Sequence, residues 1–138
     1  MTIPTSTQQP TGWTPVPLPD APAPKGAYTP GVRAGDFVFV SGQVPRDPRT
    51  GALAGDDFAT QARATLANVA GVLAAAGASL SDVVSVIVYL TSTDDWAEFD
   101  QIYREVMTPP YPTRTAVGAS LRGILVEISA IAYVGKRG

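Results

Sequence analysis

Glu127 is the acidic residue of this sequence that most needs an explanation. It lies in the segment 125–133, whose residues would alternate between two faces if the segment is a strand. One face would carry only apolar residues, and the face that carries Glu127 would also be mostly apolar. A carboxylate without a partner is unfavourable in such surroundings, or becomes neutral as its pKa rises. Glu127 therefore needs either a partner or a chemical task such as proton transfer.

Arg114 is the one charged residue of the run 112–121. A planar guanidinium is a good receptor for a carboxylate ligand, which it binds through two parallel hydrogen bonds. If the segments around Arg114 and Glu127 form neighbouring strands, the two side chains can approach one cavity. The same spacing is equally compatible with a structural ion pair between Arg114 and Glu127 at a subunit contact.

Histidine and cysteine are absent from the 138 residues. Their absence excludes a Ser-His-Asp triad, a thiolate nucleophile, a disulfide framework and the usual kind of zinc site. The formal net charge of -2 gives no general attraction for nucleic acid or for an anionic membrane. We therefore expect neither as a partner, and the 45% hydrophobic content predicts one globular domain.

The elements that must position these residues follow from hydrophobic periodicity. Helical spacing predicts one helix over 57–77 and a second over 94–107, with Trp96, Phe99, Tyr103 and Val106 on the apolar stripe of the second. Short apolar or alternating runs predict strands. These strands span 28–33, 36–41, 83–90, 113–119 and 125–133.

The predicted order is β-β-α-β-α-β-β, a mixed α+β sheet with both helices on one face. Two of the strands, 36–41 and 83–90, are apolar on both of their faces. Because two helices cover only one side of a sheet, we expect the second side to be buried in a homo-oligomer.

Eight of the 13 prolines lie within residues 1–30. This composition predicts an extended N-terminal segment over residues 1–24, followed by a single domain over 25–138 that becomes ordered near Lys25. The N-terminus lacks the layout of a signal peptide, and no apolar run approaches the ~20 residues of a membrane span. We expect a cytoplasmic protein.

Five ordered motifs resemble those of the Rid (YjgF) family of imine and enamine deaminases, also known as endoribonuclease L-PSP. They are SGQVPRDPRTG (41–51), AAAGASLSDVV (74–84), VIVYLTSTDDWAEFDQIYREV (86–106), PTRTAVGASL (112–121) and LVEISAIA (125–132). The resemblance runs from about Lys25 to Val134. It implies a chorismate-mutase-like α+β fold that assembles as a homotrimer, with active sites in the clefts between subunits.

The resemblance also implies a role for individual residues. Arg114 would hold the substrate carboxylate, Glu127 would activate the hydrolytic water, and Tyr28 and Ser41 would line the pocket. The implied reaction converts a small 2-imino or enamine acid into a 2-keto acid and ammonia, with no cofactor and no metal. Positioned general acid-base groups typically accelerate such a step by ~10² to 10⁴-fold.

Three features depart from the family pattern and bear on substrate preference. Ala116 replaces a cysteine beside the pocket, Asp100 replaces an asparagine, and the connection 121–123 is shorter than usual. Two other functions stay open. They are cleavage of single-stranded RNA and a non-catalytic, chaperone-like trimer that binds small molecules in the same cleft.

Overall fold

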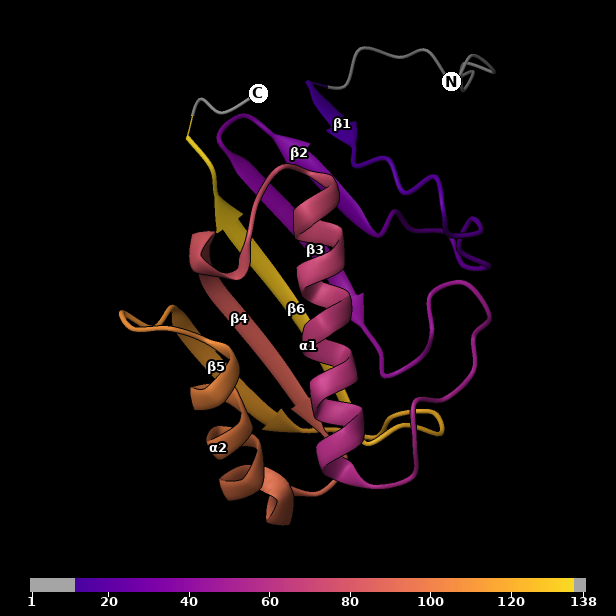
Figure 1. The fold of residues 1–138 in the computed structure, drawn as a ribbon, viewed down its shortest axis with the longest axis vertical. Helices are drawn as coiled ribbons and strands as arrows, with labels where there is room; N and C mark the ends of the chain where they lie inside the picture. The colour runs from indigo at the N-terminus through magenta and orange to yellow at the C-terminus, as the bar shows by residue number, and fades with distance from the viewer. Residues whose placement is uncertain (1–11, 136–138) are drawn as a thin grey trace, which may run out of the picture.

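The computed structural model describes residues 12–135, which form a six-stranded sheet and two α-helices (Figure 1). The strands are β1 (Trp13–Pro15), β2 (Gly31–Ala34), β3 (Phe37–Gln43), β4 (Val83–Leu90), β5 (Thr113–Gly118) and β6 (Val126–Tyr133). The helices are α1 (Phe58–Ala75) and α2 (Trp96–Val106), each next to a short 3₁₀ turn, Leu80–Asp82 after α1 and Thr93–Asp95 before α2. From β2 onwards this is the predicted β-β-α-β-α-β-β order.

The sheet has the strand order β1-β2-β3-β6-β4-β5. Only the pair β4 and β5 is parallel within the described chain, and α2 makes the crossover between them. All other neighbours are antiparallel. The last strand, β6, is therefore inserted between β3 and β4, so that β4 separates it from β5.

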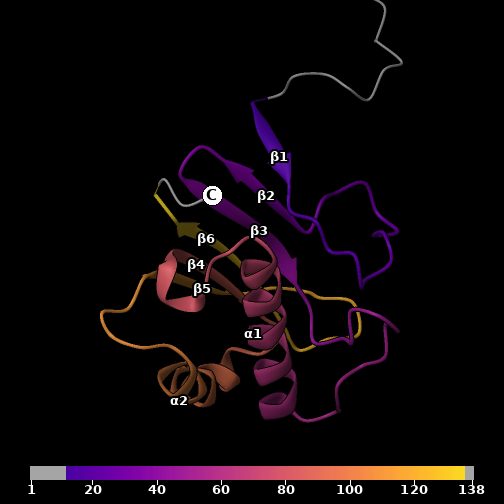
Figure 2. The same cartoon turned by 45° about the horizontal axis from the view of Figure 1, so that its top comes forward.

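Both helices lie on the same face of the sheet, as predicted (Figures 1 and 2). Helix α1 begins where the Asp57 carboxylate accepts a hydrogen bond from the backbone N–H of Thr60, at 2.9 Å. It ends before Gly77, whose φ of 77° suits a residue without a side chain. The predicted helix stripe is buried: Phe58, Ala62, Leu66, Val69 and Leu73.

Helix α2 differs from its prediction at the N-terminal end. Residues 93–95 form a 3₁₀ turn rather than the first turn of the α-helix. Trp96, predicted on the apolar stripe, is 41% exposed, whereas Phe99 and Tyr103 are buried. The helix begins only at Trp96, and the side that faces the core is instead set by Phe99, Ile102 and Tyr103.

The core lies between the helices and one face of the sheet. Along β6 the residues Val126, Ile128, Ala130 and Ala132 are buried in alternation. The opposite face of the sheet carries no element of the described chain and remains apolar. Its exposed side chains include Phe37, Phe39, Ile87, Val117 and Tyr133.

The proline-rich segment packs earlier than predicted. The sequence predicted order from near Lys25, but β1 pairs with β2 from Trp13 to Pro15. Val16 is 6% exposed and belongs to the core. Gly31 lets β2 pack closely against α1 and Val16, since an added Cβ would come within 2.6 Å of Val72 and 3.2 Å of Val16. Residues 1–11 of the predicted extension lie outside the described residues. No helix among those described is long and apolar enough to span a membrane.

Candidate functional site

Arg114 lies on β5, the edge strand, and its side chain points to the helix-bearing face. The register pairs Arg114 with Val86, a core residue of β4. The guanidinium carbon lies 4.8 Å from the centroid of the Tyr103 ring and 6.0 Å from that of Phe99. The side chain is 24% exposed. Two aromatic rings of α2 therefore support the cation while part of it stays accessible.

Asp100 binds the same guanidinium from the surface of α2. Its Oδ1 accepts a hydrogen bond from Nη1 of Arg114 at 2.9 Å, and its Oδ2 accepts one from Nε of Arg104 at 3.0 Å. The hydrogen bond from Arg114 is the main cause, and that from Arg104 the second, of a pKa of Asp100 below its ordinary value. Asp100 is therefore ionised and shared by two arginines at neutral pH.

Tyr103 contributes a buried hydroxyl next to Arg114. This oxygen has no hydrogen-bond partner among the described residues. Burial raises the pKa of the phenol, so Tyr103 is neutral at physiological pH. Its ring also lies beside that of Tyr111, with centroids 6.3 Å apart. The sequence analysis assigned Tyr103 to the core, and the structure adds that the guanidinium of Arg114 lies over its ring.

Glu127 lies on β6 and points to the open face of the sheet, where it pairs across the ladder with Tyr89. Within residues 12–135 its carboxylate forms no ion pair or hydrogen bond. The carboxylate lies directly over Gly42 of β3: an added Cβ there would be 2.2 Å from Oε2 of Glu127. The ladder between β3 and β6 is irregular between Val40 and Gln43, which brings this backbone under the carboxylate.

Arg114 and Glu127 do not share a cavity within one chain, because the condition that their strands be neighbours is not met. Their strands are not neighbours, because β4 lies between them. Paired residues of a ladder point to the same face of the sheet. Arg114 therefore points to the helix-bearing face together with buried Val86, and Glu127 points to the open face together with Tyr89. Within one chain Arg114 is paired with Asp100, and an ion pair between Arg114 and Glu127 at a subunit contact stays a prediction.

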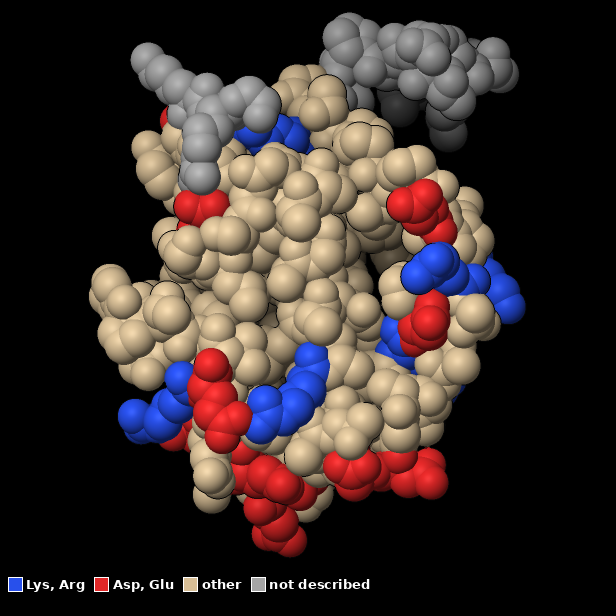
Figure 3. All heavy atoms as spheres, in the orientation of Figure 1, with Lys and Arg blue, Asp and Glu red and all other residues tan. Residues whose placement is uncertain are grey.

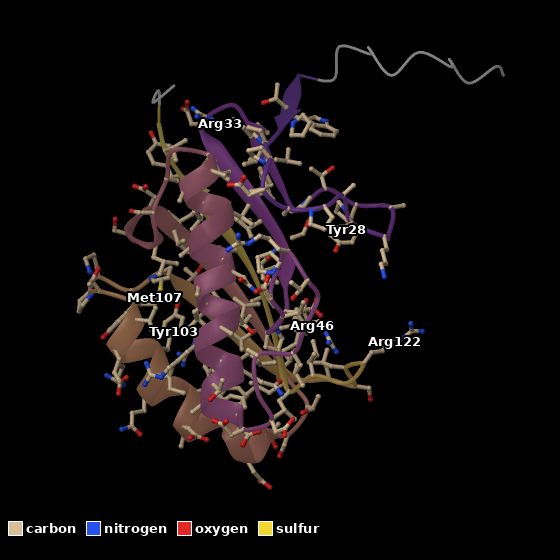
Figure 4. The ribbon with its side chains drawn as sticks, turned by 45° about the vertical axis from the view of Figure 1, so that its right-hand side comes forward. Tyr28, Arg33, Arg46, Tyr103, Met107 and Arg122 are labelled. Atoms are coloured by element: carbon tan, nitrogen blue, oxygen red, sulfur yellow. The ribbon has the colours of Figure 1, made fainter. Side chains whose placement is uncertain are left out.

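Tyr28 and Ser41 lie near the Glu127 side of the molecule. The Ser41 hydroxyl donates to the carbonyl oxygen of Thr29 at 2.6 Å, and the Ser41 N–H donates to that of Pro30 at 2.9 Å. Ser41 thus fastens the loop that carries Tyr28, whose side chain is 57% exposed. Figure 4 shows Tyr28 beside the β2 and β3 region and Tyr103 on the opposite side.

The two positions that depart from the family pattern lie on the Arg114 side. Ala116 shares the strand face of Arg114, pairs with Val88 and packs at the margin of the core. Asp100 is the ion-pair partner described above. The short connection 121–123 contains Gly123 with a φ of 68°. No group of three acidic side chains suited to a metal ion occurs among residues 12–135.

Sequence reasoning missed two residues that act on the candidate site, Arg104 and Gly42. Arg104 follows Asp100 by four residues, the spacing of an ion pair on a helix, and could have been found from that pattern. A glycine inside a strand often marks a bulge or the close approach of another group. Gly42 had that signal, but what lies over it depends on the pairing of β3 with β6.

Comparison with known proteins places the chain in one family. The family model described as Endoribonuclease L-PSP matches residues 18–134, a longer stretch than the 25–134 of the sequence resemblance. A RutC family protein of Pyrococcus horikoshii is 42% identical over 116 residues, 83% of this chain and 92% of that protein.

Two further relatives have solved structures. TdcF of Escherichia coli, whose name assigns it provisionally as a reactive intermediate deaminase, is 37% identical over 117 residues, 81% of this chain and 90% of that protein. Its crystal structure with bound serine has a TM-score of 0.78 and 35% identity, covering 87% of this chain and 98% of that one. RidA from an Antarctic Psychrobacter has a TM-score of 0.81 and 36% identity, and the match covers 88% of this chain and 99% of that one. This chain therefore belongs to the endoribonuclease L-PSP family, also called the Rid or YjgF family.

Proposed function

We propose that the protein is a hydrolytic deaminase of small 2-imino and enamine acids, with an active site formed between two protomers. One protomer supplies Arg114 and the next supplies Glu127. The observation that carries this proposal is the opposite orientation of the two side chains on the sheet. Two groups on opposite faces of one chain act on the same small molecule only if a second copy brings them together.

The open face of the sheet supports such an assembly. It exposes Phe37 (40%), Phe39 (43%) and Tyr133 (49%), a concentration of aromatic surface that a protein in water tends to cover. A shallow hollow of about 220 Å³ on this face is lined mainly by Phe39, Ile87 and Ile131. A contact in which this face meets the Arg114 side of the next copy is heterologous, and such contacts form a ring when the rotation between copies closes. Three is the number of protomers that the family resemblance predicts.

The proposed reaction uses only side chains of this chain. Arg114 binds the substrate carboxylate through N–H groups that Asp100 leaves free, which fixes the orientation of the C=N bond. Glu127 takes a proton from water as the water oxygen bonds to the imine carbon. Glu127 returns this proton to the nitrogen, which gives a carbinolamine. Glu127 then takes the proton of the carbinolamine hydroxyl and passes it to the same nitrogen as the C–N bond breaks, so that the C=O bond of a 2-keto acid forms and ammonia leaves.

The other predicted pocket residues have supporting roles in this proposal. Tyr28 is exposed and belongs to a loop that Ser41 fastens, so it can line the pocket on the Glu127 side. Ala116 and Asp100 would line the Arg114 side. TdcF of Escherichia coli has been crystallised with serine, a small molecule that carries a carboxylate next to a nitrogen-bearing carbon. The proposed substrates have the same arrangement.

The test is hydrolysis of 2-iminobutanoate, generated in situ from 2-aminobutanoate by an amino-acid oxidase and trapped with semicarbazide. The wild-type protein should compete with the trap and lower the yield of semicarbazone. Glu127→Gln should lose ~10² to 10⁴-fold in kcat, and Arg114→Ala should lose mainly kcat/KM. Glu105→Gln, which changes a carboxylate on the outer surface of α2, is the matched control and should behave as wild type. Full activity of Arg114→Ala would refute the assignment.

RNA cleavage is the second candidate, because the family model carries the name endoribonuclease. The net charge of -2 argues against it. Figure 3 shows acidic and basic side chains intermingled on the helix-bearing face, without a continuous basic surface there. Cleavage of RNA that is abolished by Glu127→Gln would favour this function. Binding of 2-keto acids without turnover of any imine would favour a non-catalytic binding protein.

A further inference from the structure

The Arg114 guanidinium is shared with a carboxylate of its own chain before any ligand arrives. Asp100 accepts from Nη1 of Arg114, and stacking on Tyr103 holds the guanidinium plane. The side chain of Asp100 is 32% exposed, so solvent screens its charge only in part. Any anion that binds the remaining N–H groups of Arg114 therefore lies close to a second negative charge.

Arg104 offsets part of that negative charge. Its Nε donates to the other oxygen of Asp100, and its side chain is 66% exposed. The helix-side cluster thus has two cations, Arg104 and Arg114, and one anion, Asp100. When the proposed neighbouring protomer adds Glu127, the site contains two positive and two negative charges and is neutral overall.

We propose that Asp100 is a specificity-determining residue that acts through Arg114 and makes the site prefer monocarboxylic over dicarboxylic imino and keto acids. This inference rests on the proposed function, since it concerns the ligands of the same site. In a neutral site a dianionic ligand experiences twice the repulsion from Asp100 that a monoanion does. The fixed carboxylate therefore disfavours a dicarboxylate more than it disfavours a monocarboxylate.

Asp100→Asn should weaken this preference for monocarboxylates. An asparagine keeps the size of Asp100, and its amide oxygen can still accept from Nη1 of Arg114. The substitution therefore removes the charge of residue 100 but keeps its hydrogen bond with Arg114. A unit charge acting over about 6 Å at a partly exposed position corresponds to roughly three- to tenfold in binding. The affinity for a dicarboxylate should therefore rise by that factor twice, and the affinity for a monocarboxylate once.

The experiment compares 2-oxopentanoate with 2-oxoglutarate, two keto acids of equal chain length that differ by one carboxylate. Isothermal titration calorimetry on the assembled protein gives the ratio of the two dissociation constants. In Asp100→Asn the ratio of dicarboxylate to monocarboxylate Kd should fall roughly three- to tenfold. Asp100→Glu, which keeps the charge, should retain the wild-type preference. Glu105→Gln, which removes a neighbouring charge of α2 that pairs with Arg63 instead, should retain it too.

Arg104 gives a second readout that a merely structural role would not produce. Arg104→Gln should strengthen the preference for the monocarboxylate in the wild-type background. In the Asp100→Asn background the same change should have a smaller effect, because the exposed Arg104 side chain then lacks the carboxylate that holds its charge near the site. Arg63→Gln is the matched arginine control, since its partner is Glu105.

An unchanged ratio in Asp100→Asn, or an equal change in Glu105→Gln, overturns this inference. Measuring imine hydrolysis with the same variants separates it from the proposed function. Hydrolysis by the wild type together with an unaltered ratio would refute the role of Asp100 alone. A ratio that shifts as expected in a protein that hydrolyses no imine would refute the deaminase function and keep Asp100 as the selectivity element of a binding site.

Discussion

At the scale of single residues, the candidate site is built from side chains whose neighbours decide what they can do. Arg114 is held by a carboxylate and two aromatic rings, which orient a cation that would otherwise move freely. Glu127, in contrast, has no side-chain partner in the described chain and is placed by the backbone beneath it. A general base needs such a position, because a partner that donates to the carboxylate would lower its basicity.

Gly42 provides the prediction at this scale. A Cβ at position 42 would lie 2.2 Å from Oε2 of Glu127, so Gly42→Ala must displace the carboxylate. We expect imine hydrolysis to fall at least about tenfold in kcat, because a small misplacement of a catalytic group is costly. KM should change less, since Arg114 is untouched. The measurement is steady-state kinetics beside thermal unfolding.

Gly71→Ala is the control for that substitution. Gly71 lies in α1, and nothing approaches a Cβ there within 4 Å. Alanine in a helix interior should leave activity unchanged and raise the free energy of unfolding by roughly 0.5 to 1 kcal/mol. If Gly42→Ala retained the kcat of wild type, the backbone of β3 would not be what positions Glu127.

At the scale of elements, β6 contributes to both faces of the sheet. One side of this strand forms the core with α1, and the other side carries Glu127 toward the open face. Because side chains alternate strictly, a slip of one residue in register would exchange the core set with the Glu127 set. The apolar residues of β6 therefore fix the direction of the Glu127 carboxylate.

Ile128 tests this connection. It is 1% exposed and is adjacent to Glu127 on the core side of β6. Ile128→Ala should lower the free energy of unfolding by about 2 to 5 kcal/mol, as expected for a large side chain removed from a core. Ile131→Ala, on the open face of the same strand, should cost the folded chain less and instead weaken assembly. Urea unfolding and light scattering of both variants distinguish the two faces, and equal losses of stability without an assembly defect would contradict this division.

At the scale of the whole molecule, the proposed site is completed only by a second copy. The helix-bearing face supplies Arg114, and the open face supplies Glu127. In this proposal, assembly and catalysis are one property: the apolar surface that drives association also brings the two charges together. A variant that stays monomeric should accordingly be inactive even when its fold is intact.

Mixed assemblies give the prediction at this scale. Arg114→Ala and Glu127→Gln should each be inactive alone. In the proposed trimer, coexpression of the two variants should recover about one third of wild-type activity in mixed assemblies, because one of the three contacts in each mixed ring pairs an intact Arg114 with an intact Glu127. The activity is measured on assemblies purified through a different tag on each variant. Recovery of none would mean that both residues act within one chain, against the composite site.

Local patterns in the sequence predicted both helices, most of the strands and the chemical types at the candidate site. Periodicity identified both helices and every strand from β2 onwards, because helix and strand spacing are local properties of the chain. The lone charges identified Arg114 and Glu127, and the apolar second face of the sheet was visible in the strands themselves.

The spatial relation of those residues follows from the packing of strands that are far apart in the chain. The insertion of β6 between β3 and β4, and the register of each ladder, turn Arg114 and Glu127 to opposite faces. The same packing gives Arg114 its partner Asp100 and places Glu127 over Gly42. Strand order and register depend on contacts between residues far apart in the chain, and no local pattern encodes which strand lies beside which.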